Sequence, residues 1–332
     1  MGEVWSMRLS IIIVNFNTLS YLKDCLSNLH SLALPFDFET IVVDNGSVDG
    51  SQEWLKTQSR CKYILSSENL GFAKGNNLAI KEAKGEYILL LNTDAFPQKG
   101  SIERLIDFLD THKQVGVAGP RLNFPDGRWQ RGYNIIPSVK KAWMVLFTDV
   151  QNICYLLIWS TIDKLNHKLS HKLNHKLEHK LDHKLSLARY LGLTRPKQVG
   201  YVDGCCMMIK REVIGNIGLL DESFFFFVED AEFCYRAKQK GYGVYYLPDA
   251  HVIHIRGGSS AQKDLEKAVK FRREAEKLFI VRTFGENAWA RYSGIMYGNF
   301  FIRYRIARFL NRSSQHYFSC ALKEFSKESR RD

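Results

Sequence analysis

The chain has 332 residues, of which 45% are hydrophobic and 13% aromatic. This composition excludes a disordered chain and is enough to bury one large α/β core, with room for a smaller second unit. The formal net charge of +12, from 47 Lys and Arg against 35 Asp and Glu, predicts a polyanionic neighbour: nucleic acid, a phosphorylated substrate or anionic lipid. Charge alone does not choose among the three.

The cysteines and the apolar segments bear on the location of the protein. The seven cysteines include no Cys-x-x-Cys pair and are odd in number, which is typical of reduced cytosolic thiols. The apolar run at residues 9–14 is too short for a secretory signal. Residues 143–162 are long enough to cross a bilayer, but Asp149, Gln151 and Asn152 at their centre make that costly. We therefore expect this segment to be interfacial or buried, and the protein to be cytoplasmic.

The first third of the chain alternates between strand and helix patterns. Residues 9–14 are continuously apolar and rich in β-branched side chains, which is typical of a strand buried on both faces. Further strands are expected at residues 39–43, 62–65 and 86–91, and helices at residues 18–32 and 72–83. Alternation at this spacing predicts an α/β fold with a mostly parallel sheet and right-handed connections.

The regular alternation stops past Pro120, and residues 137–196 fit no sheet. Patterns return with strand-like sequence at 199–209, a helix at 230–240, and strands at 244–247 and 251–255. We therefore expect a first α/β half at residues 1–136 and an insertion at 137–197. A second α/β half would follow at 198–260, and a basic helical region at 261–332.

The insertion contains a Lys-Leu-x-His repeat of period four at residues 164–185. At about 100° per helical residue, successive leucines are displaced by about 40°, so no straight helix buries them all on one face. Histidines at i and i+4 can share a metal, which makes a metal site one reading. The histidines are His167, His171, His175, His179 and His183. The favoured reading is an expanded repeat forming a solvated or membrane-surface helix, because a lysine beside every histidine opposes a cation.

The C-terminal region carries much of the excess charge. From Lys263 to Asp332 there are 16 Lys and Arg against 8 Asp and Glu. At residues 297–310 basic side chains alternate with bulky apolar ones, which fits an amphipathic helix on an anionic membrane. A terminal helix packed on the protein, with a solvated basic face, explains the same pattern. Both alternatives stay open.

Polar side chains follow two predicted strands at the point where each ends. Asp44 and Asn45 end the second strand, where a carboxylate can accept hydrogen bonds from a base or a ribose. Asn92 and Asp94 follow the fourth strand, and a carboxylate there suits a hard divalent cation such as Mg²⁺ or Mn²⁺. A turn with a helix cap explains the first segment equally well, and for the second, taken alone, it is the favoured interpretation.

Two glycines in residues 68–77, Gly71 and Gly75, allow a ligand to approach the backbone closely, although the segment is neither a Walker loop nor GxGxxG. Asp230, preceded by Glu229, opens a helix after four phenylalanines. Apolar surroundings raise the pKa of a carboxylate and a helix N-terminus lowers it, a combination that suits a general base, with helix capping as the alternative. His254 ends a strand and is either a metal ligand or a core histidine.

Together these motifs resemble the inverting glycosyltransferases of family 2, and especially the rhamnosyltransferase-like branch that builds bacterial surface polysaccharides. The resemblance covers about residues 8–137 and 198–285. The matching segments are residues 11–17, 43–49, 69–77, 91–94, 119–121, 202–206 and 229–234, and His254.

The resemblance implies a GT-A (Rossmann-like) fold, with a mostly parallel central sheet flanked by helices, a helical low-complexity insertion and C-terminal helices. It implies a nucleoside-diphosphate sugar as donor, bound by the first half, and a Mg²⁺ or Mn²⁺ ion on Asp94 and His254. It also implies Asp230, with Glu229 beside it, as the general base of the acceptor-side half. The donor-binding residues would be Asn15, Asp44, Asn45, Gly71, Lys74, Gly75, Asn76 and Asn92.

The sequence departs from the family pattern at the metal motif, usually Asp-x-Asp, because Asn92 replaces the first acid and removes one formal charge. The Gln-x-x-Arg-Trp signature of processive synthases is absent, which favours one sugar per encounter. The resemblance implies transfer of L-rhamnose from dTDP-L-rhamnose to a lipid-linked glycan. We expect an anionic membrane surface as a partner, peripheral association with the cytoplasmic membrane, and no nucleic acid.

Two alternatives remain open. A galactofuranosyl, mannosyl or glucosyl transferase would use the same residues. A non-catalytic nucleotide or nucleic-acid binder would explain the charge, but it would have no use for Glu229 and Asp230 together with His254 at the rim of the sheet.

Overall fold

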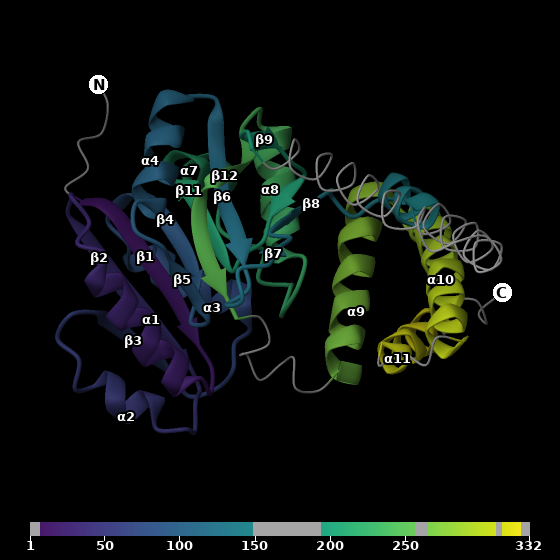
Figure 1. Cartoon of the computed structure of the whole chain (residues 1–332), viewed down its shortest axis with the longest axis horizontal. Coiled ribbons are helices and arrows are strands. Elements are labelled where there is room, and N and C mark those ends of the chain that lie inside the picture. Colours follow the sequence, from purple (N-terminus) through teal and green to yellow (C-terminus); the bar gives the residue numbers. More distant parts are fainter. Residues whose placement is uncertain (1–6, 149–193, 256–264, 310–313, 327–332) are drawn as a thin grey trace, which may run out of the picture. The chain divides into compact units, whose positions relative to one another are not determined.

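The computed structural model describes residues 7–148, 194–255, 265–309 and 314–326 (Figure 1). The chain divides into two compact units, Met1–Ile136 with Pro196–Phe279 and Pro137–Arg195 with Ile280–Asp332. The Lys-Leu-x-His repeat at residues 164–185 lies outside the described residues, as do residues 149–162 of the long apolar segment.

A sheet forms the centre of the first unit. Strand β1 (Met7–Asn15) pairs in parallel with β2 (Phe38–Asn45) and with β4 (Gly85–Asn92), and β2 pairs in parallel with β3 (Lys62–Ser66). The four strands expected in the first third of the chain are therefore confirmed. In β1 the side chains of Ile11, Ile12 and Ile13 are all buried, because both faces of the sheet are covered.

The rest of the sheet contains strands of both directions. Strand β11 (Cys206–Lys210) runs antiparallel to β4 and to β6 (Val115–Asn123), and β12 (Gly243–His254) runs parallel to β6. The short strand β5 (Ala95–Pro97) pairs antiparallel with β12. The order is β3-β2-β1-β4-β11-β6-β12-β5. The sheet is therefore parallel over its first four strands and mixed beyond them.

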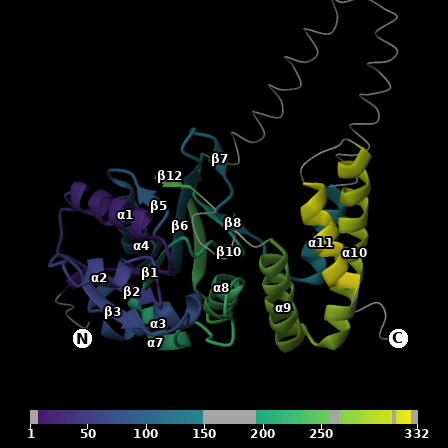
Figure 2. The ribbon, with the colours of Figure 1, turned by 90° about the horizontal axis from the view of Figure 1, so that it is seen from below.

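Helices cover both faces of this sheet, as expected for an α/β fold. Figure 2 shows α1 (Leu19–Ser31) and α4 (Ser101–Thr111) on one face, and α3 (Phe72–Glu82) and α7 (Arg211–Ile217) on the other. The apolar sides of α1 and α4 join the strands in one buried cluster. The short helix α2 (Ser51–Leu55) follows β2, and α8 (Glu229–Gln239) packs near β10 (Tyr201–Val202) and β12.

Two strand predictions in the second half were wrong in their boundaries. The patterns at 244–247 and 251–255 form the single strand β12, whose pairing with β6 shifts register between Leu247 and His251. Pro120, past which the alternation was expected to stop, lies inside β6 opposite Leu247, next to that irregularity. A proline has no N–H for the ladder, so a register shift is where a strand tolerates one.

The pattern at 199–209 divides into β10 and β11, with a turn between them. Short pairings complete this region: β7 (Trp129–Gln130) with β6, β8 (Tyr133–Asn134) with β10, and β9 (Lys197–Gln198) with β12. Strand β7 carries Gln130 toward the end of β12, where its side chain meets His254.

The second unit contains helical residues 139–148, α10 (Glu286–Phe309) and α11 (Gln315–Ser326), while α9 (Leu265–Phe284) begins in the first unit. The predicted C-terminal helices are thus present. The ring of Phe300 lies 5.4 Å from that of Phe325, so part of the apolar pattern at 297–310 packs on α11. None of the helices in the described ranges is long and apolar enough to span a membrane.

Candidate active site

The carboxyl ends of β1, β2 and β4 meet at one edge of the sheet. Asn15 pairs with Asp44 across β1 and β2, and its Nδ2 donates to Asp44 Oδ2 at 2.7 Å. Thr18 Oγ1 donates to Asn15 Oδ1 at 2.7 Å and lies 3.0 Å from Thr93 Oγ1, just past β4. Side-chain hydrogen bonds therefore join the three strand ends into one rim, which is where open α/β sheets bind ligands.

Asp44 is fully buried, and its carboxylate is engaged by the protein itself. Besides the bond from Asn15, Oδ1 accepts from the Ser47 N–H at 2.8 Å and from Gln52 Nε2 at 2.9 Å. A carboxylate has about four acceptor positions, so most of its capacity orders the turn after β2. A nucleotide could hydrogen-bond to Asp44 only at an acceptor position that the protein does not already occupy.

Asn45 connects this turn to the glycine-containing segment. Its Nδ2 donates to Asn69 Oδ1 at 2.9 Å and to the Gly71 carbonyl at 3.1 Å, while its Oδ1 accepts from the Leu70 N–H at 3.0 Å. The amide thereby holds the backbone that leads into α3. Asn45 and Gly71 both line a cavity at this rim.

Gly71 has a left-handed φ of +82° and lies directly against the segment of four phenylalanines. A Cβ at this position would stand 2.4 Å from the carbonyl oxygen of Phe225, which also accepts from the Phe72 N–H at 2.9 Å. Only glycine allows both the φ value and this approach.

The other predicted residues of α3, Lys74, Gly75 and Asn76, do not line the cavity. A Cβ at Gly75 would come 3.1 Å from Val14 Cγ1, so this glycine permits close packing of α3 on β1. Asn76 is buried, and its Nδ2 donates to the Phe72 carbonyl at 2.9 Å. Lys74 is exposed. Of the predicted residues in this segment, Gly71 alone is among those that line the cavity.

Asp94 and His254 face each other, both almost fully buried. Asp94 Oδ1 lies 3.4 Å from His254 Nε2. The antiparallel pairing of β5 with β12 causes this approach, because it places Ala95 opposite His254 and lets the Ile255 N–H donate to the Asp94 carbonyl at 3.0 Å. On its other side, His254 Nδ1 lies 2.6 Å from Gln130 Oε1.

The donor atoms at this rim fit a divalent cation only together with a substrate. In the described part of the chain no three His, Cys, Asp or Glu side chains gather as a metal site. Mg²⁺ usually takes one or two protein carboxylates and completes its shell with phosphates and water. Asp94 and His254 would supply two ligands, and Asn92, which lines the same cavity, could add an uncharged amide oxygen. A nucleotide diphosphate would then provide the remaining oxygens.

Asp230 and Glu229 lie in the first turn of α8. Asp230 accepts from the Gly204 N–H at 3.0 Å and from the Ala231 N–H at 2.7 Å. Burial raises the pKa of Asp230, and these two N–H groups and the guanidinium of Arg272 oppose that rise. An acid whose charged form is disfavoured by burial, but still held by backbone donors, is a suitable general base.

Glu229 has a different environment from its neighbour. Its side chain is 5% exposed, and Oε2 has no hydrogen-bond partner among the residues that the structure describes. Burial, followed by the nearby charge of Asp230, raises the pKa of Glu229 well above its usual range. Asp230 is the more exposed of the two residues, so an acceptor could reach it more readily.

The backbone just before this pair is strained. Phe227 and Val228 both have a φ of +71°, which is rare for a bulky or β-branched residue. Such conformations persist only where the surroundings enforce them, and they cluster at functional sites.

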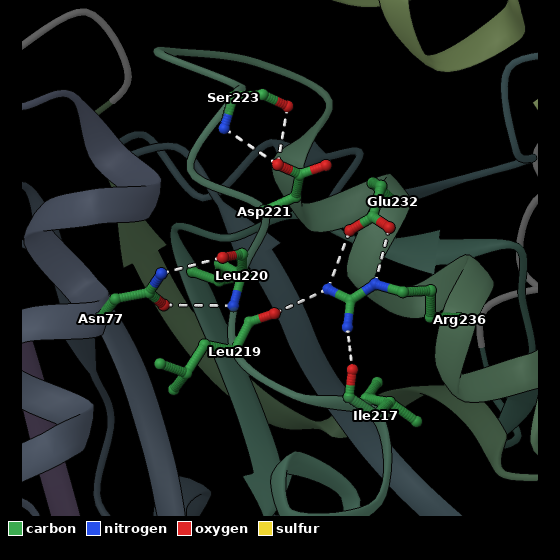
Figure 3. A network of polar contacts seen from close by, with 8 residues as sticks. All are labelled: Asn77, Ile217, Leu219, Leu220, Asp221, Ser223, Glu232 and Arg236. Atoms are coloured by element: carbon green, nitrogen blue, oxygen red, sulfur yellow. Dashed lines mark hydrogen bonds and ion pairs between the residues drawn. The ribbon is translucent and has the colours of Figure 1, made fainter. Parts of the chain in front are cut away.

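Figure 3 shows the polar contacts that hold the loop before the strained residues. Asn77 on α3 donates to the Leu220 carbonyl at 2.8 Å and accepts from the Leu220 N–H at 3.1 Å. Arg236 on α8 binds the carbonyls of Ile217 and Leu219 and pairs with Glu232. The loop is therefore clamped from α3 and from α8, which stabilises the strained entry into α8.

The cavity at this rim has a volume of about 90 Å³. Among the predicted residues it is lined by Asn45, Gly71, Asn92 and Asp94. Its aromatic lining is Phe16, Phe72, Phe225 and Phe226. Ligand pockets usually measure about 300–1,000 Å³, so this cavity holds only part of a nucleotide sugar, and its lining offers that part both polar groups and phenyl rings.

The buried thiol of Cys205 links the two acidic positions. Burial raises its pKa far above the usual range, and the charges of Asp203, Cys206, Asp94 and Asp230 raise it further. Backbone hydrogen bonds connect the two positions more directly, because the Gly204 N–H donates to Asp230 at 3.0 Å and the carbonyl of the next residue, Cys205, accepts from the Asn92 N–H at 2.9 Å. One turn of the chain therefore contacts both the candidate base and the end of β4, two residues before Asp94.

Besides the phenylalanines and threonines of the rim, the sequence reasoning missed Gln130 and Arg272, which lie beside the candidate metal ligand and the candidate base. Gln130 follows a Pro-Asp-Gly turn, and no local pattern relates it to His254. Arg272 on α9 stands 5.0 Å from the ring of Phe227 and lowers the pKa of Asp230, yet in sequence it is one of many basic residues of the C-terminal region. The order of the motifs would not have revealed either residue.

The fold and this rim define an α/β protein with a candidate ligand site at the carboxyl ends of its parallel strands. Residues 10–218 match the family model described as glycosyl transferase family 2. The chain therefore belongs to glycosyl transferase family 2 and is a glycosyltransferase with the GT-A fold.

Relatives and solved structures agree with this assignment. The chain is 24% identical over 266 residues to the N-acetylglucosaminyl-diphospho-decaprenol L-rhamnosyltransferase of Mycobacterium tuberculosis, covering 76% of this chain and 78% of that protein. It is 27% identical over 250 residues to the low-salt glycan biosynthesis hexosyltransferase Agl10 of Haloferax volcanii, covering 74% of this chain and 66% of that protein.

A solved structure with the same fold is the mannosyltransferase PcManGT of Pyrobaculum calidifontis in complex with GDP-Man and Mn²⁺. It superposes with a TM-score of 0.52 at 12% identity, covering 99% of this chain and 90% of that one. The likeness confirms the α/β fold expected from the sequence.

Proposed function

We propose that this glycosyltransferase moves one sugar, L-rhamnose from dTDP-L-rhamnose, to a hydroxyl of a lipid-linked glycan, with inversion and with a divalent cation. The observation that carries the proposal is the meeting of Asp94 with His254 at 3.4 Å beside the cavity of the strand rim. Asp230 lies at the same site. This set of groups suits a donor with a diphosphate and an acceptor with a hydroxyl.

In the proposed reaction Asp230 takes the proton of the acceptor hydroxyl. The oxygen attacks the anomeric carbon from the side opposite the diphosphate, the new carbon–oxygen bond forms as the bond to the diphosphate breaks, and the configuration inverts. The Gly204 and Ala231 N–H groups keep the Asp230 carboxylate oriented throughout. Glu229, buried beside it with a raised pKa, would remain a neutral supporting residue.

Asp94 and His254 would hold a Mg²⁺ or Mn²⁺ ion, which supplies positive charge beside the departing diphosphate. Asn45, Gly71 and Asn92 line the cavity and are the proposed donor contacts. Four other predicted residues would support these contacts without touching the donor, because they order the turn after β2 and helix α3. They are Asn15, Asp44, Gly75 and Asn76. Lys74 is exposed and is proposed to contact the outer part of the donor.

The identity of both substrates rests on the relatives. The name of the mycobacterial relative specifies an L-rhamnosyl donor group and a decaprenol-linked acceptor. We propose the same donor group, and an acceptor that is likewise linked to a lipid, for this chain. The surplus of basic residues after Lys263 supports a peripheral position on an anionic cytoplasmic membrane, where such acceptors are found. Binding to vesicles with and without anionic lipid, at low and high salt, tests this part separately.

Transfer of another hexose is the second candidate. Agl10 is named only as a hexosyltransferase, so a galactofuranosyl, mannosyl or glucosyl donor fits the same residues. Membership in the family argues against a protein that binds nucleotide or nucleic acid without catalysis.

A thermal-shift screen of the full chain tests the donor. The donors are dTDP-rhamnose, UDP-galactofuranose, UDP-glucose and GDP-mannose, each with Mn²⁺ and with chelator. A ligand that binds the native state raises its apparent stability, by about 2.7 kcal/mol at 100 times its dissociation constant. We expect a Mn²⁺-dependent rise with dTDP-rhamnose, and a rise with a different donor alone would reassign the sugar.

A further inference from the structure

The structure places one polar side chain behind the imidazole of His254. Gln130, on β7, is 3% exposed, and His254, at the end of β12, is 8% exposed. His254 Nδ1 and Gln130 Oε1 are 2.6 Å apart, and the opposite nitrogen of the ring, Nε2, faces Asp94 Oδ1 at 3.4 Å. The imidazole therefore lies between a buried amide and a buried carboxylate.

The orientation of the Gln130 amide follows from its second contact. Its Nε2 lies 3.5 Å from the backbone carbonyl of His254. A carbonyl oxygen only accepts, so the amide nitrogen belongs on that side and the amide oxygen on the side of the ring. The reversed amide would bring two oxygens together and would leave the carbonyl without this donor.

An amide oxygen can only accept a hydrogen bond, so the ring nitrogen that it meets must carry the proton. In the neutral imidazole this leaves Nε2 with a free lone pair directed toward Asp94. We infer that Gln130 is a positioning residue, which holds His254 in the tautomer and orientation that present Nε2, with Asp94, to the divalent cation. The inference rests on the proposed function in one respect, the presence of that cation.

Metal binding in this chain depends on the orientation of His254 more than it would in a site with two carboxylates. Asn92 stands where a second carboxylate would add charge, so Asp94 and His254 carry the protein's share of the binding. A metal-bound histidine commonly donates its other N–H to an oxygen, and loss of that partner costs about 10–100-fold in metal affinity or activity. Without Gln130, the ring gains a proton on Nε2 that can bond Asp94, and the lone pair is lost.

The test uses the full chain and three variants. Gln130→Met keeps the length of the side chain but removes the acceptor, and Gln130→Glu restores an acceptor. Gln98→Met makes the same change at an exposed glutamine just past β5 that does not touch His254. Mn²⁺ affinity is measured by electron paramagnetic resonance with dTDP, and in parallel with UDP. We expect binding about 10–100-fold weaker in Gln130→Met and unchanged in Gln98→Met. Gln130→Glu should bind more tightly than Gln130→Met, because it restores the acceptor, but less tightly than wild type, because its second oxygen faces the His254 carbonyl.

A second measurement needs no metal. In ¹⁵N-histidine-labelled, metal-free protein, the His254 signals are assigned by their loss in His254→Gln. The wild type should show a proton on Nδ1 with the chemical shift of a hydrogen-bonded N–H, because Nδ1 meets Gln130 Oε1, and Gln130→Met should lose that signal. A merely space-filling role for Gln130 would not produce this loss.

The outcomes separate the two proposals. Wild-type protein that fails to bind Mn²⁺ with either nucleotide would refute the cation of the proposed function, while the Nδ1 signal would still decide the role of Gln130. Equal Mn²⁺ affinity in wild type and Gln130→Met, or a wild-type His254 without a proton on Nδ1, would overturn the inference about Gln130.

Discussion

Replacement of Gly71 by alanine tests the contact between the glycine-containing segment and the four phenylalanines. The new Cβ would stand 2.4 Å from the Phe225 carbonyl oxygen and 2.8 Å from Phe225 Cδ2, at a φ of +82°. With a ψ of 179°, Gly71 lies in a region that is essentially restricted to glycine, and an L-residue there costs about 1–3 kcal/mol. Displacing the Phe225 backbone adds about 1–3 kcal/mol of overpacking. We expect a total loss of stability of about 2–6 kcal/mol.

Gly100→Ala is the control for a positive φ without a steric contact, because Gly100 has a φ of +81° and a ψ of −6°, in the left-handed region, and no atom lies within 4 Å of the position that its new Cβ would take. It should lose only about 1–2 kcal/mol, from backbone strain alone. Both variants are compared with wild type by urea unfolding, and donor affinity is measured by calorimetry. Gly71→Ala should also weaken donor binding, since Gly71 lines the cavity, whereas Gly100→Ala should not.

The result that would refute this reasoning is equal behaviour of the two variants. If their stabilities differ by less than about 0.5 kcal/mol, the Phe225 carbonyl does not lie against Gly71. If the stabilities differ but donor affinity is the same, the contact exists and the cavity is not the donor site.

Four further variants test the roles of the acidic groups and of Arg272. Asp230→Asn should lower the transfer rate by about 10²–10⁴-fold with donor binding retained, and undiminished transfer would exclude Asp230 as the base. Glu229→Gln should keep near-normal transfer at neutral pH, because burial raises the pKa of Glu229 and glutamine resembles its neutral form. A loss of transfer as large as that of Asp230→Asn would instead make Glu229 a candidate for the general base. Asp94→Ala should abolish the Mn²⁺ dependence of donor binding, and an unchanged dependence in calorimetry would remove Asp94 from the site. Arg272→Met should raise the pKa of Asp230, since the guanidinium lowers it; the base is active when ionised, so the acidic limb of the rate profile should move to higher pH, and an unmoved limb would contradict the pairing.

Much of the site could be predicted because its parts follow local patterns. The apolar runs of β1, β2 and β4 end at Asn15, Asn45 and Asn92, and parallel strands bring such ends to one edge of a sheet. Asp230 was predictable from its place at the start of a helix after an apolar run. Each of these inferences needs only residues that are close in sequence.

Other parts could not be predicted, because they depend on pairing between distant segments. Nothing near Asp94 shows that β5 turns back to run antiparallel to β12, yet that pairing brings Asp94 to His254. Likewise, β6 escaped the sequence reasoning, because Pro120 interrupts its strand pattern, and a register shift of β12 accommodates that proline. Helix α4 was also missed, although its apolar residues follow a local helical pattern.

The sequence by itself determined the strand and helix order of the first third, the polar ends of its strands and the family to which the chain belongs. Only the tertiary structure decided that Asp44 is buried and engaged by the protein, that Gln130 meets His254 and that Arg272 lies near Asp230. The physical reason is that periodicity and turn chemistry act between neighbours along the chain. Hydrogen bonds and charges across the fold depend on which surfaces the packed sheet brings together.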